Sequence, residues 1–290
     1  MLAFFFGDFL SDVMTALCRR VLVAGGLVLI GGLLAAPPSA AQHERTVTRT
    51  VDVNAKGKVD VNAVACRVRV TTWDRPAVEM TARIEGASRE AVDNMEIQVE
   101  GDSHRVSIKA AGQEAGDGGL LAMLGFGDGA SGPRTHYTLK MPATASLEVV
   151  TQAADVEVTG LQGSLTVEGS SSSVRLRDLE GSVTVATFSG ALEARNLGGR
   201  LVFATFSGDA NVRLSEGAAE TILATFSGDA TLTLPADAAF DLRTDVTWGG
   251  GVTSDFEIPS ASGDEPAPVG GGGPKVVFES FSGDLRLRAE

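Results

Sequence analysis

Five aromatic residues recur at matching places in the second half of the chain and are its first candidates for contacting a ligand. Phe188, Phe206 and Phe226 each lie in a Thr-Phe-Ser-Gly motif, Phe281 lies in Ser-Phe-Ser-Gly, and Trp248 lies in Thr-Trp-Gly-Gly. If these side chains faced solvent, the row could stack on sugar rings or contact a partner protein. If they faced inward, they would form a packing ladder at one corner of the fold. We favour the packing interpretation, because stacked identical side chains commonly fill the corners of repeat proteins.

Three aspartates, Asp209, Asp229 and Asp284, follow the glycine of these motifs. Stacked carboxylates repel one another, so a calcium ion between them would be stabilising. Ser-Gly-Asp is also an ordinary tight-turn sequence, in which glycine supplies a positive φ. Ala191 and Gly251 occupy the same slot in other units, where the carboxylate is missing. We therefore favour a turn and predict neither a bound metal nor a cofactor.

Residues suited to catalysis are scarce. The 3 histidines are His43, His104 and His136, and the serines of the motif lack the Gly-x-Ser-x-Gly elbow of hydrolases. No His/Cys spacing typical of a metal site appears. We predict that the chain is not an enzyme. The alternative is a polysaccharide-active enzyme on a β-helix, which would require acidic groups gathered in a groove.

The motifs belong to a repeat whose basic spacing is 18 residues, as from Gly169 to Thr187 to Thr205. Units begin at 151, 169, 187, 205, 225, 247 and 280. Aliphatic and polar residues alternate on both sides of each motif, which predicts two short strands per unit with every second side chain facing inward. A unit of this size cannot bury its apolar face alone, so units must stack.

Charge supports this register independently. Glu157, Arg175 and Glu193 fall in one outward slot of successive units and alternate in sign, as stacked neighbours would. A left-handed hexapeptide helix is excluded, because it needs an aliphatic residue every six positions and Gln162 stands six after Val156. The expected fold is all-β: a single-stranded β-solenoid of parallel stacked coils with a β-rich N-terminal capping region.

The chain divides into three parts by composition. Residues 1–41 are typical of a signal peptide, with Arg19 and Arg20 before an uncharged run from Val21 to Ala36 and a small-residue cleavage site at Ser39-Ala40-Ala41. Met14 is a possible true start. The alternative is a retained anchor, but the run is shorter than the roughly 20 residues of a membrane span, so we expect no transmembrane span in the mature chain.

The remaining parts are a β-rich region over 42–140, with a glycine-rich loop at 112–132, and the repeats over 141–290, with a flexible Gly/Pro-rich insert at 260–274. The net charge of −13 argues against nucleic acid or an anionic membrane as the main partner, because phosphate binding needs a basic footprint. An acidic surface also keeps an all-β protein soluble.

The Thr-Phe-Ser-Gly-Asp units followed by alternating aliphatic residues resemble a bacterial family of unknown function known as a "putative adhesin" with β-strand repeats. Leu139-Lys140-Met141-Pro142 and Leu232-Thr233-Leu234-Pro235 are similar to that family as well. The resemblance runs from Val47 to the C-terminus and is most specific from Thr138 to Glu290. The chain departs from the family in placing Phe where a smaller aliphatic residue is common and in its long Gly/Pro insert.

The resemblance implies a β-solenoid in the cell envelope and supplies no catalytic residues. Together with the signal peptide, it predicts an exported protein, periplasmic or on the cell surface. We expect it to act as an adhesin or as a binding or scaffold protein for an envelope polysaccharide or a protein partner.

Overall fold

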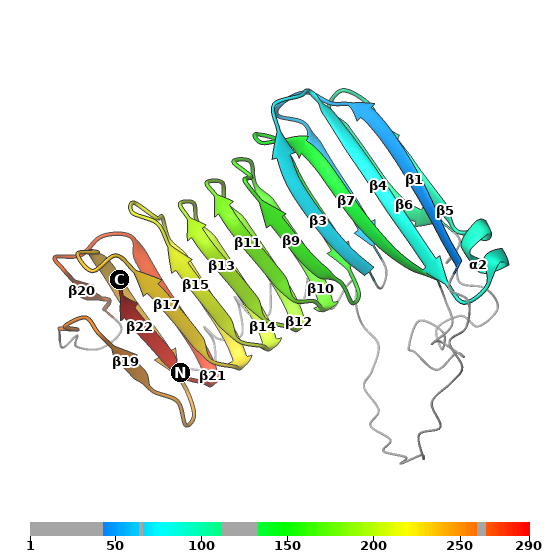
Figure 1. Ribbon diagram of the computed structural model, residues 1–290. Helices are drawn as coiled ribbons and strands as arrows, with labels where there is room; N and C mark the ends of the chain where they lie inside the picture. The colour runs from blue at the N-terminus through cyan, green and yellow to red at the C-terminus, as the bar shows by residue number, and fades with distance from the viewer. Residues whose placement is uncertain (1–42, 64–65, 112–132, 260–264) are drawn as a thin grey trace, which may run out of the picture.

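The computed structural model describes residues 43–63, 66–111, 133–259 and 265–290. The predicted signal peptide, the glycine-rich loop at 112–132 and residues 260–264 of the insert lie outside these residues. The described part is nearly all strand, with one short helix, α2 (Arg89–Asn94), and its strands form two sheets of 11 strands each (Figure 1). The all-β prediction is confirmed.

The two sheets pack face to face, and both run along the length of the molecule. In spatial order, sheet A contains β1 (His43–Asp52), β4 (Ala77–Gly86), β7 (Arg134–Pro142), β3 (Cys66–Trp73), β9 (Asp155–Thr159), β11 (Val174–Leu179), β13 (Leu192–Leu197), β15 (Ala210–Leu214), β17 (Ala230–Leu234), β22 (Leu285–Ala289) and β19 (Val252–Ser254). Sheet B contains β20 (Ala267–Val269), β18 (Phe240–Val246), β21 (Lys275–Ser282), β16 (Thr221–Ser227), β14 (Leu201–Ser207), β12 (Val183–Ser189), β10 (Leu165–Ser171), β8 (Ser146–Thr151), β2 (Lys58–Ala63), β6 (Arg105–Ala111) and β5 (Glu96–Gly101).

In the middle of both sheets, parallel strands pair residues that are one repeat apart. Leu165 lies opposite Val183 in sheet B, and Val174 lies opposite Leu192 in sheet A. The chain alternates between the sheets, so each unit contributes one strand to each. The apolar residues of every unit therefore stack on the same positions of the next.

The core lies between the sheets and is continuous. One cluster of buried side chains extends from Val53 to Leu287, and Leu161, Leu179 and Leu197 fill the corner where the chain passes from sheet A back to sheet B. Burying each such side chain contributes roughly 1.5–3 kcal/mol. The inward-facing side chains of each strand therefore account for most of the stabilisation of the stack.

The N-terminal region extends both sheets at one end. Strands β2 and β3 are parallel to β8 and β9, with Val59 opposite Leu147 and Val68 opposite Val156. Beyond them, β4 is antiparallel to both β7 and β1, and β5 is antiparallel to β6. Helix α2 packs Val92 into a small separate cluster at this end.

The last units do not stack in chain order, which corrects the expectation of one rung per successive repeat. Strand β21 lies between β16 and β18 in sheet B. Strand β22 lies between β17 and β19 in sheet A (Figure 1). Along the chain, β18 and β19 come before β21 and β22. In space, however, β21 and β22 lie between them and the preceding rung, β16 and β17. The segment at 255–274, which includes β20 antiparallel to β18, connects β19 to β21.

The glycines of the repeated motif are required by close approach between rungs. A Cβ atom on Gly208 would lie 2.1 Å from the carbonyl oxygen of Gly190, and one on Gly228 would lie 2.2 Å from that of Gly208. The sequence predicts that these glycines supply a positive φ. Among the motif glycines at 190, 208, 228 and 283, only Gly190 has one. Stacked backbones at the turn leave no room for a side chain.

Candidate functional site

The phenylalanine row faces outward, so the inward packing interpretation is wrong. Along β12, Val183, Val185 and Thr187 are buried, and the alternation places Phe188 on the outer face with 48% of its surface exposed. The strand continues to Ser189, so the period-2 pattern is not interrupted before the phenylalanine. This continuity was readable in the sequence, because Val-x-Val-x-Thr-Phe fixes the side of the phenylalanine once the strand is known to include it.

The rings of Phe188, Phe206, Phe226 and Phe281 stack face to face. Successive centroids lie 4.9, 4.7 and 4.7 Å apart, with interplanar angles of 2°, 4° and 1°. This spacing matches the roughly 4.8 Å between neighbouring strands, so the sheet dictates the stack. Neighbouring rings cover both faces of Phe206 and Phe226 and one face each of Phe188 and Phe281. The ladder therefore presents ring edges to its surroundings, with free faces only at its two ends.

Trp248 is not a rung of this ladder. Val246 lies opposite Ser280, which places Thr247 rather than Trp248 opposite Phe281. Val252 is again in register with Leu285, so the turn at 247–251 holds one residue more than the turn at 281–284. The tryptophan is 71% exposed, and its backbone N–H donates to the Phe281 carbonyl at 2.7 Å. The extra residue displaces the indole from the stack.

Two further apolar rows accompany the phenylalanines on the outer face of sheet B. Residues two and four positions before the phenylalanines lie on the same face by alternation, but the three alanines and Val202 are at most 6% exposed. Three of the four residues two positions before are alanines, with Glu279 as the fourth, and three of the four residues four positions before are branched aliphatic residues, with Thr184 as the fourth. We call these three rows the sheet B strip: Phe188, Phe206, Phe226, Phe281, Ala186, Ala204, Ala224, Val202, Ile222 and Val277. The strip spans β12, β14, β16 and β21 and is bordered by Glu168 of β10 on one side.

At its other border the strip meets a charged groove. Glu279 continues the alanine row, with Asp245 opposite it on the next strand and Arg243 two residues earlier. Burial raises the pKa of the Glu279 carboxyl, the Arg243 charge opposes this rise, and the Asp245 charge adds to it. The groove has a volume of about 290 Å³, and its lining residues are Glu220, Ile222, Asp241, Arg243, Pro266, Lys275, Val277 and Glu279.

The aspartates of the motif accept backbone hydrogen bonds from the next rung. Oδ1 of Asp209 accepts the N–H of Asp229, Oδ1 of Asp229 accepts that of Asp284, and Oδ1 of Asp284 accepts that of Gly251, each at 2.9 Å. These bonds follow the spatial order of the rungs rather than their order in the chain. Within the described residues, no group of three or more His, Cys, Asp or Glu side chains could hold a metal ion. The row stabilises the turns.

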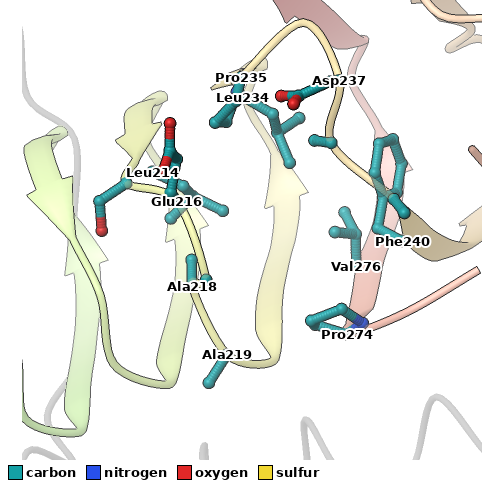
Figure 2. Close-up of a pocket in the computed structure, with 14 residues that line it drawn as sticks. Leu214, Glu216, Ala218, Ala219, Leu234, Pro235, Asp237, Phe240, Pro274 and Val276 are labelled. Atoms are coloured by element: carbon teal, nitrogen blue, oxygen red, sulfur yellow. The ribbon is translucent and has the colours of Figure 1, made fainter.

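A second cavity, of about 350 Å³, lies at the corner between sheet A and sheet B (Figure 2). Strand β17 connects to β18 rather than to β21, so the loop at 235–239 spans the position of a strand that it does not enter. Leu214, Leu234, Phe240 and Val276 line the space left beneath it. Ser215, Glu216 and Asp237 supply the polar part of its lining.

Titratable groups with shifted pKa values lie apart from one another. A hydrogen bond to Glu148 raises the pKa of Lys58 on β2, and backbone hydrogen bonds from His104 and Arg105 lower the pKa of the Asp102 carboxyl in the turn before β6. Neither is near Glu279 on β21. Among the helices of the described part, none is long and apolar enough to cross a membrane.

No family model matches the sequence, and no curated protein matches it. Three solved structures are similar in outline. A "putative cell adhesion protein" from Clostridium sporogenes is 12% identical, with a TM-score of 0.32, over 86% of this chain and 100% of that chain. A "putative adhesin" from Bacteroides fragilis is 12% identical, with a TM-score of 0.37, over 84% and 97%.

A "putative adhesin" from Parabacteroides distasonis is 11% identical, with a TM-score of 0.25, over 83% of this chain and 97% of that chain. These descriptions agree with the family that the repeat motifs resemble.

Proposed function

We propose that this chain is an exported, non-enzymatic β-solenoid of the cell envelope that acts as an adhesin-like binding module for a protein partner. The observation that carries the proposal is the sheet B strip, whose phenylalanine row lies on the outer face of four adjacent strands, with Phe188 exposed and the other three rings half-buried. Apolar rows on the outside of a sheet contribute nothing to the core between the sheets. Contiguous apolar surface bordered by polar residues is typical of a protein-binding site.

The geometry of the ladder favours a protein over a sugar. A sugar ring binds an aromatic residue through the ring face, and the faces within this ladder are occupied by neighbouring phenylalanines. Ring edges and aliphatic side chains suit the apolar side chains of another protein. The scattered positions of the shifted titratable groups, Lys58, Asp102 and Glu279, support a binding role over catalysis.

Export rests on residues 1–41, which lie outside the described residues. Expression of the full chain in a Gram-negative host with fractionation tests it. We expect the protein in the periplasm or at the surface, with its N-terminus at or near Gln42 by mass spectrometry. Cytoplasmic protein with an intact N-terminus would contradict export.

Binding is tested with residues 42–290 coupled to fluorescent beads and applied to surfaces coated with envelope or matrix proteins and to a glycan array. Phe188→Ser changes the most exposed ring at one end of the ladder and leaves the other three rings stacked. We expect several-fold weaker adhesion to protein-coated surfaces and an unchanged melting temperature. Trp248→Ser is the matched control, because it removes an exposed aromatic residue outside the ladder.

Each part of the proposal has its own contrary result. Phe188-dependent binding to glycans without binding to proteins would overturn the partner class. Equal effects of the two substitutions would show that the ladder is not the contact surface. Release of new reducing ends from an envelope polysaccharide would favour the alternative of a polysaccharide-active enzyme.

A further inference from the structure

A column of arginines crosses the outer face of sheet A. Arg177 of β11, Arg195 of β13 and Arg213 of β15 lie opposite one another across parallel strands, and all three are exposed. We call these three residues the arginine column. Arg288 of β22 continues it on the far side of Thr233. The strands that carry it lie side by side in Figure 1. Because neighbouring strands are about 4.8 Å apart, positive charge is concentrated locally in a chain whose net charge is −13.

Nearer the N-terminal end of the same sheet, three arginines are neutralised by acidic residues. Arg67 pairs with Asp155 at 3.4 Å, and Arg69 pairs with Glu157 at 3.0 Å, both between β3 and β9. Arg83 of β4 contacts two glutamates. This is the usual arrangement of a solvated sheet face, where opposite charges face each other.

The arginine column departs from this arrangement, because its cross-strand neighbours carry the same charge. Arg195 contacts Glu193 of its own strand at 2.8 Å, and Arg213 contacts Glu290 at 2.6 Å. Arg175, two residues before Arg177, contacts the same Glu193 carboxylate at 3.7 Å. Within the described part of the chain, Arg177 itself makes no ion pair. Like charges directly opposite each other are destabilising, so an external anion along the column would be favourable.

The chemistry of the guanidinium group indicates the kind of anion. Its planar fork binds a carboxylate through two parallel hydrogen bonds, which a lysine cannot do. The contacts to Glu193 and Glu290 show that these side chains reach carboxylates from their positions on the sheet. A polymer with one carboxylate on each repeating unit could offer one carboxylate to each successive strand.

We propose that the arginine column binds a carboxylated polysaccharide that lies across the strands of sheet A. This site is on a different sheet from the sheet B strip and does not depend on the proposed protein partner. The two sites would allow one stack to contact a protein through one sheet and an acidic glycan through the other.

The test uses residues 42–290 and polygalacturonate, with neutral dextran and inorganic polyphosphate as comparison probes, measured by biolayer interferometry at low ionic strength. The variant Arg177→Gln/Arg195→Gln/Arg213→Gln changes the column. The control variant Arg67→Gln/Arg69→Gln/Arg83→Gln removes the same number of charges from the same sheet, where each arginine pairs with a carboxylate of a neighbouring strand. We expect about ten-fold weaker binding of polygalacturonate for the column variant, because each exposed ion pair contributes modestly, and a much smaller change for the control.

Three results would overturn the proposal. The wild-type protein could bind polygalacturonate no better than dextran, the two variants could lose binding equally, or polyphosphate could bind more tightly than polygalacturonate. Far-ultraviolet circular dichroism reports whether the variants fold. If the triple column variant does not fold, Arg177→Gln alone decides, because that side chain has no ion pair to lose; about two-fold weaker binding is expected, and unchanged binding would count against the site.

Discussion

At the scale of single residues, the aspartate row shows how a turn residue connects rungs. Each carboxylate accepts the backbone N–H of the next rung, from Asp209 to Asp229 to Asp284 to Gly251. A backbone donor at a turn needs an acceptor, and a hydrogen bond of this kind contributes about 0.5–1.5 kcal/mol. The bonds account for aspartate after the motif glycine without a bound cation.

Asp229→Ala should lower the free energy of unfolding by about 1 kcal/mol, because the Asp284 N–H loses its acceptor. Asp229→Asn keeps an oxygen at Oδ1 and should lie close to the wild type. Urea denaturation measures both, with Asp237→Ala as an exposed control. A melting temperature that rises with added calcium in the wild type but not in Asp229→Ala would contradict this account and restore the metal interpretation.

The positions of the phenylalanines and of the tryptophan are only partly predictable from the sequence. The motif spacing correctly predicted that Phe188, Phe206, Phe226 and Phe281 fall in one row. The spacing alone does not give the side that they face, which depends on whether the strand includes the motif, as β12 does. Trp248 was misplaced because one extra residue in its turn is invisible when the motif itself has degenerated.

At the scale of strands, the outer face of sheet B changes from apolar to charged at β21. Ala186, Ala204 and Ala224 occupy one row on three successive strands, and Glu279 takes the same position on the fourth. Its carboxyl is half-buried, with Asp245 opposite and Arg243 near. A larger acidic side chain at the end of an alanine row therefore costs stability when it is ionised.

The resulting pH dependence has a definite sign. The pKa of Glu279 is raised above its ordinary value of 4.5 in the folded state. The folded protein therefore holds this proton more tightly than the unfolded chain, so the group favours folding most below the unfolded pKa. This contribution is lost as the pH rises through the folded pKa.

Glu279→Gln should therefore be more stable than the wild type at pH 7, and the difference should shrink at pH 4. Thermal denaturation of both proteins at the two pH values measures this. Glu180→Gln, which removes an exposed carboxylate on another turn, is the control variant. A wild type that is the more stable protein at pH 7 would show that attraction to Arg243 outweighs burial.

At the scale of the whole molecule, the order of the rungs was the least predictable feature. The sequence predicts which residues of a unit face inward, because alternation is local. It does not predict which unit stacks on which, because every unit offers its neighbours the same rows. In this protein β21 follows β19 and β20 in the chain but lies between β16 and β18, and β22 then lies between β17 and β19.

The N-terminal half was harder to predict for a related reason. Strands β2 and β3 match the register of β8 and β9, yet they are separated from them in the chain by β4 to β7. Without a repeated motif, the pairing of Val59 with Leu147 has no local signal. Long-range pairing of this kind is selected by the fit of complete strands in the folded state.

Cysteine pairs test the exchanged order directly, in a background with Cys66→Ala. Thr231 lies opposite Arg286 in the structure, and Arg286 lies opposite Thr253, so Thr231 and Thr253 are two strands apart. A disulfide needs Cα atoms about 4.4–6.8 Å apart, whereas two strand spacings amount to roughly 10 Å. Thr231→Cys/Arg286→Cys and Arg286→Cys/Thr253→Cys should therefore cross-link under mild oxidation, as measured by thiol titration and non-reducing electrophoresis, and Thr231→Cys/Thr253→Cys should not. The opposite pattern, with cross-linking between positions 231 and 253 only, would mean that the units stack in chain order.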